Sequence, residues 1–226
     1  VERGVAARDR FQPVIEVEHD FVQRQFVHQH GAGADIREIF LAAAAILAGD
    51  ALLTLAFAIL ADDEMDLPAE RRTALILELA RASGVGGMVG GQMLDLAGEG
   101  TLPGESEIIR TQAMKTGALI RFACEAGAIT AGAGQEERER MAEFGSAIGL
   151  AFQLADDLLD LTADAATLGK SPGKDAAAGK ATLAALHGEE WTRRQLGGLI
   201  EQAHALLEPF GDRAGLLRAA ASFVAT

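Results

Sequence analysis

Apolar side chains recur along most of the sequence at the three-to-four-residue spacing of amphipathic α-helices. Valine and isoleucine are scattered and seldom form the alternating runs that are typical of strands. Glycine, proline and acidic residues interrupt the apolar pattern and mark the ends of the expected helices. The pattern predicts helices over residues 35–61, from about residue 68 onward, over 105–132 as one long helix or a kinked pair, and over 135–161, 189–208 and 212–224.

The length and composition agree with a helical protein that has a substantial core. The sequence has 226 residues, 49% of them hydrophobic and only 5% aromatic. This length leaves room for one large domain or two small ones, and we favour a single domain over residues 1–226. We therefore predict an all-α bundle of roughly six to eight helices, with acidic and lysine side chains pointing into a central cavity.

The longest apolar run, residues 39–61, is interrupted only by Gly49 and Asp50. Its length would allow a membrane span, but a charged residue in its middle favours a buried core helix. The net charge of −13 argues against binding of nucleic acid or of an anionic membrane surface. The single Cys124 allows no disulfide and fits a reducing compartment. We expect a cytoplasmic protein without a signal peptide, without stable membrane insertion and without a nucleic-acid partner.

Asp156, Asp157 and Asp160 place three carboxylates within five residues of an otherwise apolar helical run. On a helix Asp156 and Asp160 point the same way, Asp157 lies one step round the face, and Gln153 lies one turn before Asp156. Like charges at this spacing repel unless a cation lies between them. Carboxylates without histidine or cysteine suit Mg²⁺. The alternative is a solvated acidic helix face, which the apolar neighbours disfavour.

Several lysines could supply positive charge for a phosphate group. Lys115 stands among apolar residues, while Lys170, Lys174 and Lys180 each follow a glycine in a segment rich in glycine. Lysine side chains of this kind can reach phosphate oxygens as point charges. For Lys115 the alternative is a surface lysine whose apolar stem covers the helix.

A second group of acids, Asp62, Asp63 and Asp66, also has the spacing Asp-Asp-x-x-Asp. It stands at a helix end directly before Pro68, where the chain must turn. Acidic residues are favoured next to a helix N-terminus, so this group is predicted to be a solvated loop.

Five glycines lie between residues 84 and 91, a segment that Gln92 and Asp95 follow at once. Glycine weakens a helix, and so many glycines are tolerable where another helix or a ligand comes very close to the backbone. Gln92 and Asp95 are three residues apart and share one helix face. The segment does not follow a strand, so a dinucleotide-binding turn is excluded by context.

Taken together and in this order, several of these segments resemble the motifs of trans-prenyl diphosphate synthases, most of all bacterial farnesyl diphosphate synthases (geranyltranstransferases). The matching segments are residues 46–53, 87–96, 115–119, 152–160 and 167–170. The resemblance covers roughly residues 40–225. It implies an isoprenoid-synthase-type helical bundle around a central cavity, usually as a homodimer. It also implies an enzyme of isoprenoid biosynthesis that condenses isopentenyl diphosphate with an allylic diphosphate, head to tail and with Mg²⁺, to make farnesyl diphosphate.

The resemblance assigns roles to individual residues. The metal ligands would be Asp156, Asp157 and Asp160. The catalytic residues would be Lys115, Thr116, Gln153 and Lys170. The diphosphate substrates would contact Lys115, Gln153, Lys170, Gln92, Asp95 and Arg10. Arg10 is included because Arg10-x-x-Pro13 resembles, weakly, the family's basic motif for isopentenyl diphosphate.

The sequence departs from the family pattern in residues 1–45. The family has a first Asp-rich motif, followed by two arginines, ahead of the segment 46–53, and this sequence has neither. Either segments that carry the first motif are absent from the sequence at hand, or the protein lacks this site. The intact second motif and its lysines favour the first explanation. The second would make the protein a non-catalytic or regulatory diphosphate-binding subunit. A terpene cyclase of related fold is a third alternative, but it would not need the motifs around Lys115 and Lys170.

Overall fold

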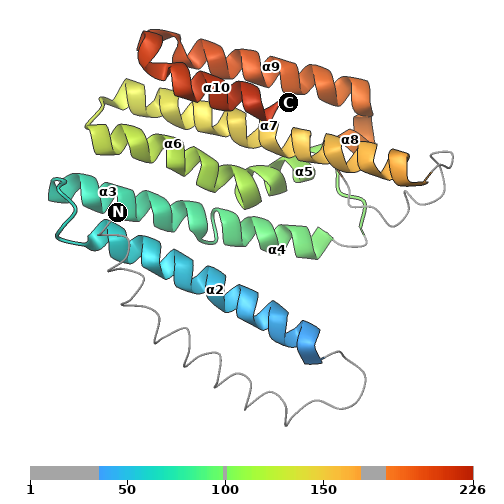
Figure 1. Ribbon diagram of the computed structural model, residues 1–226, viewed down its shortest axis with the longest axis horizontal. Helices are drawn as coiled ribbons and strands as arrows, with labels where there is room; N and C mark the ends of the chain where they lie inside the picture. Colours follow the sequence, from blue (N-terminus) through green and yellow to red (C-terminus); the bar gives the residue numbers. More distant parts are fainter. Residues whose placement is uncertain (1–35, 99–100, 169–181, 226) are drawn as a thin grey trace. The chain divides into compact units, whose positions relative to one another are not determined.

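The structure, a computed structural model, describes residues 36–98, 101–168 and 182–225 (Figure 1). All regular elements in these ranges are helical, which confirms the all-α prediction. The α-helices are α2 (Ile36–Ala61), α3 (Ala69–Ser83), α4 (Met88–Gly98), α5 (Glu105–Gln112), α6 (Ala118–Ala131), α7 (Gln135–Leu168), α8 (Leu183–His187), α9 (Glu189–Leu207) and α10 (Gly215–Val224). The chain divides into two compact units, residues 1–62 and 63–226, which are described separately. The single domain over residues 1–226 stays a prediction.

Helix boundaries differ from the sequence prediction in several places; the helix predicted over 212–224, for example, begins at Gly215, after the 3₁₀ segment η3 (Glu208–Ala214). The range 105–132, predicted as one long helix or a kinked pair, consists of α5 and α6 joined by a π-helical segment, η1 (Ala113–Gly117). Helix α7 continues seven residues past the predicted end at 161, since no glycine or proline stops it before Gly169. The short helix α8 was not predicted, because five residues are too few for a periodic pattern.

The first unit contains α2, whose 26 residues include the long apolar run. Residues Ala43–Ala61 are long and apolar enough to cross a membrane, judged by length and composition alone. No residue of this stretch is buried within the structure as described, and its burial in a core stays a prediction. One such helix is weak grounds for a membrane span, and nothing further follows from it.

The core of the second unit is organised around α7. This helix packs against α6 on one side and against α9 and α10 on another (Figure 1). Its buried side chains recur every three or four residues and pack with apolar residues of the neighbouring helices. The buried apolar residues of α7 are Met141, Ala142, Phe144, Ala147, Ala151, Leu154 and Leu158. Asp156 and Asp160 therefore belong to a helix that its apolar face holds in place.

A tight turn sets α6 and α7 side by side. Gly132 ends α6 in the left-handed conformation, with φ of 72°, which glycine adopts at little cost. Two residues later the backbone N–H of Gly134 donates to the Glu137 carboxylate at 3.1 Å and caps the start of α7. The resulting helical hairpin places the middle of α6 against the first half of α7.

Glycines allow the helices to approach closely in the middle of this hairpin. A Cβ atom added at Gly149 of α7 would lie 2.9 Å from the Cα of Gly117, and one at Gly145 would lie 2.6 Å from the Cα of Arg121. Real Cβ atoms do not come this close to backbone atoms. Any side chain at Gly145 or Gly149 would therefore push η1 and α6 away from α7.

Cys124 lies in α6 beside this close contact and packs against the core. Burial raises the pKa of the Cys124 thiol, so less of the reactive thiolate is present at neutral pH. We expect a thiol reagent at pH 7.5 to label the native protein at least about tenfold more slowly than the protein in denaturant. Equal rates would show that α6 and α7 separate readily in the native protein.

Candidate functional site

Lys115 and Asp95 form an ion pair between two segments that the sequence analysis singled out. Lys115 belongs to the π-helical segment η1 and Asp95 to α4, and the Lys115 Nζ lies 2.6 Å from the Asp95 Oδ2. The two side chains are 31% and 23% exposed, so the pair is reachable from solvent. The ion pair holds the lysine in one place without burying its charge.

Close backbone contact creates this pair. The backbone of α4 at Gly91 lies against the backbone of η1 at Met114 and Lys115, with no room for a Cβ atom at Gly91. Asp95 is one helical turn beyond Gly91, on the same face of α4. The glycine-rich segment 84–91 thus serves a close helix approach, one of the two roles that the sequence predicted for it.

Thr116 and Gln153 are also brought together, from η1 and α7. The Thr116 hydroxyl donates to the Gln153 Oε1 at 3.4 Å. The contact lies one helical turn beyond the close approach of Gly149 to Gly117. Both residues were predicted as catalytic, and the structure places their polar groups in contact.

Asp157 points into the protein and is only 5% exposed. Its Oδ1 accepts a hydrogen bond from the Gln153 Nε2 at 3.1 Å, and its Oδ2 accepts one from the Gln112 Nε2 at 3.1 Å. Burial raises the pKa of Asp157 above the usual aspartate value, the two amide hydrogen bonds oppose the rise, and the charges of Asp156 and Asp160 add to it.

Asp156 and Asp160 differ from Asp157 in their surroundings. Both are exposed and lie four residues apart on one face of α7. Two exposed carboxylates fit Mg²⁺, which commonly takes one or two carboxylates and leaves its other positions to water and substrate phosphates. Within the described residues no group of three or more carboxylate, histidine or cysteine side chains is placed to hold a metal. Metal binding by the three aspartates stays a prediction.

Gln112 is a site residue that the sequence analysis missed. It ends α5, immediately before the π-helical segment, and its amide joins the end of α5 to α7 through Asp157. The one available signal was that Gln112 stands three residues before Lys115. The buried partner, however, could not be foreseen from spacing.

The structure says less about the remaining predicted site residues. Gln92 is partly buried in α4, one turn before Asp95. Arg10 and Lys170 lie outside the described residues, so their predicted roles stay predictions. The acidic group 62–66 follows α2, and its carboxylates are exposed, as expected for a loop. Within it Asp63 pairs with Arg72 at 3.2 Å.

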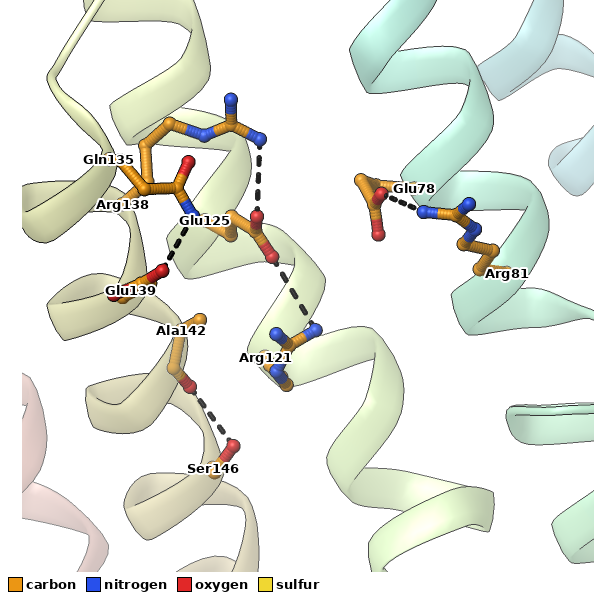
Figure 2. Close-up of polar contacts among 9 residues, drawn as sticks. All are labelled: Glu78, Arg81, Arg121, Glu125, Gln135, Arg138, Glu139, Ala142 and Ser146. Carbon is orange, nitrogen blue, oxygen red and sulfur yellow. Dashed lines mark hydrogen bonds and ion pairs between the residues drawn. The ribbon is translucent and has the colours of Figure 1, made fainter.

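A separate charged cluster lies further along α6 and α7 (Figure 2). Glu125, whose side chain is 11% exposed, pairs with Arg121 at 3.4 Å and with Arg138 at 3.3 Å. It borders a cavity of about 490 Å³ between α3, η1, α6 and α7, which Glu78 and Arg81 also line. Lys115, Thr116, Gln153 and the acidic end of α7 do not line this cavity, but Met114 and Gly117 of η1 do.

The fold and the site define an all-α protein in which lysine, amide and carboxylate groups from several helices come together. Comparison with known proteins is more specific: residues 34–207 match the polyprenyl synthetase family. The chain belongs to this family.

Relatives and solved structures agree with this assignment. The chain is 46% identical over 171 residues to farnesyl diphosphate synthase of Escherichia coli, covering 75% of this chain and 57% of that protein. It is 39% identical over 181 residues to geranylgeranyl diphosphate synthase of Cyanophora paradoxa, covering 80% of this chain and 60% of that protein. The chain therefore spans little more than half the length of these curated relatives.

The fold is also that of solved structures. An FPP/GFPP synthase from Zymomonas mobilis superposes with a TM-score of 0.72 at 40% identity, covering 87% of this chain and 66% of that one. A geranyltransferase from Legionella pneumophila superposes with a TM-score of 0.68 at 27% identity, covering 93% of this chain and 70% of that one. These likenesses confirm the isoprenoid-synthase-type helical fold expected from the sequence motifs.

Proposed function

We propose that the protein is a prenyltransferase that condenses isopentenyl diphosphate with an allylic diphosphate, head to tail. The observation that carries the proposal is the meeting of α4, η1 and α7 at one site. There Lys115 pairs with Asp95, and Thr116 contacts Gln153. Family membership and the names of the relatives support the same function.

The charges of the site suit an anionic leaving group. Lys115 would bind oxygens of the allylic diphosphate, and Asp95 would keep the lysine oriented before the substrate arrives. Asp156 and Asp160 would hold Mg²⁺, which supplies neutralisation of the negative charge that develops on the departing diphosphate. By resemblance, Lys170 adds a second lysine and Arg10 contacts isopentenyl diphosphate.

The reaction separates charge, and the polar groups of η1 and α7 would stabilise the charges that develop. The bond between carbon 1 and the diphosphate oxygen breaks, and its electrons leave with the diphosphate. The double bond of isopentenyl diphosphate attacks the allylic cation, and loss of a proton restores a double bond. Thr116 and Gln153 would present oxygen atoms near the developing cation, where they stabilise positive charge. Apolar helix faces would keep water from the cation.

We further propose farnesyl diphosphate as the product, a homodimer as the working state and the cytoplasm as the location, without stable membrane insertion. The name of the Escherichia coli relative supports the product, whereas the Cyanophora paradoxa relative is named for a longer one. The net charge of −13 supports the absence of binding to anionic membranes and nucleic acid.

The test is an assay of the purified full-length protein with isopentenyl diphosphate, geranyl diphosphate and Mg²⁺. We expect diphosphate release that requires both substrates and stops when EDTA removes the metal. The product's chain length, read by mass spectrometry, checks the farnesyl assignment.

Two outcomes would contradict the proposal. Binding of both substrates without turnover would indicate a non-catalytic subunit, the alternative raised by residues 1–45. Consumption of the allylic diphosphate in the absence of isopentenyl diphosphate would indicate a cyclase.

A further inference from the structure

The carboxylate of Asp157 is held by two amide groups, whereas its two acidic neighbours face outward. Each Asp157 oxygen accepts one hydrogen bond at 3.1 Å, from Gln112 on one side and from Gln153 on the other. With 5% of the residue exposed, little room remains for a metal ion and its water. Asp156 and Asp160, in contrast, are exposed on the same helix.

This arrangement fixes the orientation of the Gln153 side chain. A carboxylate accepts hydrogen bonds only, so the NH₂ group of Gln153 must face Asp157 and its carbonyl oxygen must face away. That oxygen accepts from the Thr116 hydroxyl at 3.4 Å. The Thr116 hydroxyl hydrogen then points to Gln153, and the Thr116 oxygen keeps its lone pairs as hydrogen-bond acceptors.

Gln112 supports the same arrangement at a cost. Its Oε1 atom is buried and has no hydrogen-bond partner among the described residues. Burying a polar oxygen without a partner is unfavourable, so another interaction must compensate for it. The compensation available is the hydrogen bond from its Nε2 to the buried charge of Asp157.

We propose that Asp157 is a positioning residue rather than a metal ligand, and that Gln112 and Asp157 together hold Gln153 and Thr116 in their working orientation. The chain of hydrogen bonds connects the buried negative charge to the Thr116 oxygen and polarises that oxygen toward a developing cation. The catalytic meaning of this relay rests on the proposed prenyl transfer. The inference that Asp157 does not bind the metal is independent of that function.

The first test measures Mg²⁺ binding, which needs no turnover. Calorimetry with inorganic diphosphate present would compare full-length wild-type protein with Asp156→Asn, Asp157→Asn and the exposed control Asp63→Asn. We expect Asp156→Asn to weaken Mg²⁺ binding about tenfold or more, and Asp157→Asn to match the control within about twofold. Equal weakening by Asp156→Asn and Asp157→Asn would overturn the proposal.

The second test asks whether Asp157 acts through Gln153. The asparagine of Asp157→Asn keeps the shape but faces one glutamine with an NH₂ group, so that amide must turn. We expect kcat to fall about 10-fold to 100-fold, with the Mg²⁺ concentration for half-maximal rate unchanged. Gln153→Ala should lower kcat similarly, and adding Asp157→Asn to it should cost little more. If the fold-losses of kcat of the two single variants multiplied in the double variant, the relay would be overturned.

Gln112→Leu provides a further comparison, because it removes the second amide and leaves Gln153 in place. We expect a smaller loss of kcat than for Asp157→Asn, and no change in Mg²⁺ binding. Thermal unfolding of each variant checks that it is folded. If wild-type protein shows no turnover, the proposed function fails, and the calorimetric comparison still decides whether Asp157 binds metal.

Discussion

Replacing Asp156 with alanine is expected to lower the rate of prenyl transfer about 100-fold or more, with little effect on protein stability. Asp156 is exposed on α7, so its removal leaves no cavity and breaks no buried contact. The reaction rate should fall, since a carboxylate that holds Mg²⁺ helps to neutralise the charge on the leaving diphosphate. Steady-state kinetics at several Mg²⁺ concentrations, with thermal unfolding of the same samples, measure both effects.

The control for this prediction is Asp63→Ala, in the second group of acids. Asp63 is also exposed, and its partner Arg72 lies at 3.2 Å. Loss of this surface ion pair should change stability by less than about 1 kcal/mol and leave turnover within about twofold. Equal loss of turnover in Asp156→Ala and Asp63→Ala would mean that the wrong acidic group was assigned to the metal.

The sequence predicted the fold class because helical spacing is a local pattern. Helical spacing places Asp156 and Asp160 on one face of α7 whatever packs around it. The roles predicted for Lys115 and Thr116 came from the resemblance to the family and from the order of its motifs. The structure then brought Lys115 to Asp95, a pairing that connects segments 20 residues apart and that no local pattern specifies.

The role of Asp157 could not be predicted from spacing. Its position one step round from Asp156 is compatible with a metal ligand and with a buried acceptor alike. The choice depends on Gln112, which is 45 residues away in the sequence. Tertiary contact therefore decides between two roles that are identical at the level of helix geometry.

The π-helical segment Ala113–Gly117 also lies beyond sequence reasoning. A π-helical turn costs free energy by itself and persists where packing or function compensates for it. Here it carries both Lys115 and Thr116, and two glycine contacts enclose it: Gly91 of α4 approaches at Lys115, and Gly149 of α7 approaches at Gly117. The helix is thus deformed where two backbones come closest, and the side chains predicted to be catalytic, Lys115 and Thr116, lie at that point.

Gly91→Ala tests whether the close contact between α4 and the π-helical segment positions Lys115. It is expected to affect both stability and turnover. The added Cβ would overlap the backbone nitrogen of Lys115 and would lie 2.6 Å from its Cα, so α4 and η1 must separate. Overpacking of this kind costs about 1–3 kcal/mol. The separation would also move Lys115 away from Asp95 and from the diphosphate, and a displacement of about 1 Å can reduce turnover about 100-fold. Urea unfolding and steady-state kinetics measure the two effects.

Gly127→Ala is the matched control, because Gly127 is an exposed glycine of α6 with no atom within 4 Å of an added Cβ. Alanine there removes the entropic disadvantage of a helical glycine, so the protein should be stabilised by about 0.5–1 kcal/mol with unchanged kinetics. The two variants make the same chemical change in helices of the same unit, so a difference between them reports the space at Gly91. If Gly91→Ala were as stable and as active as Gly127→Ala, the contact between α4 and the π-helical segment would not position Lys115.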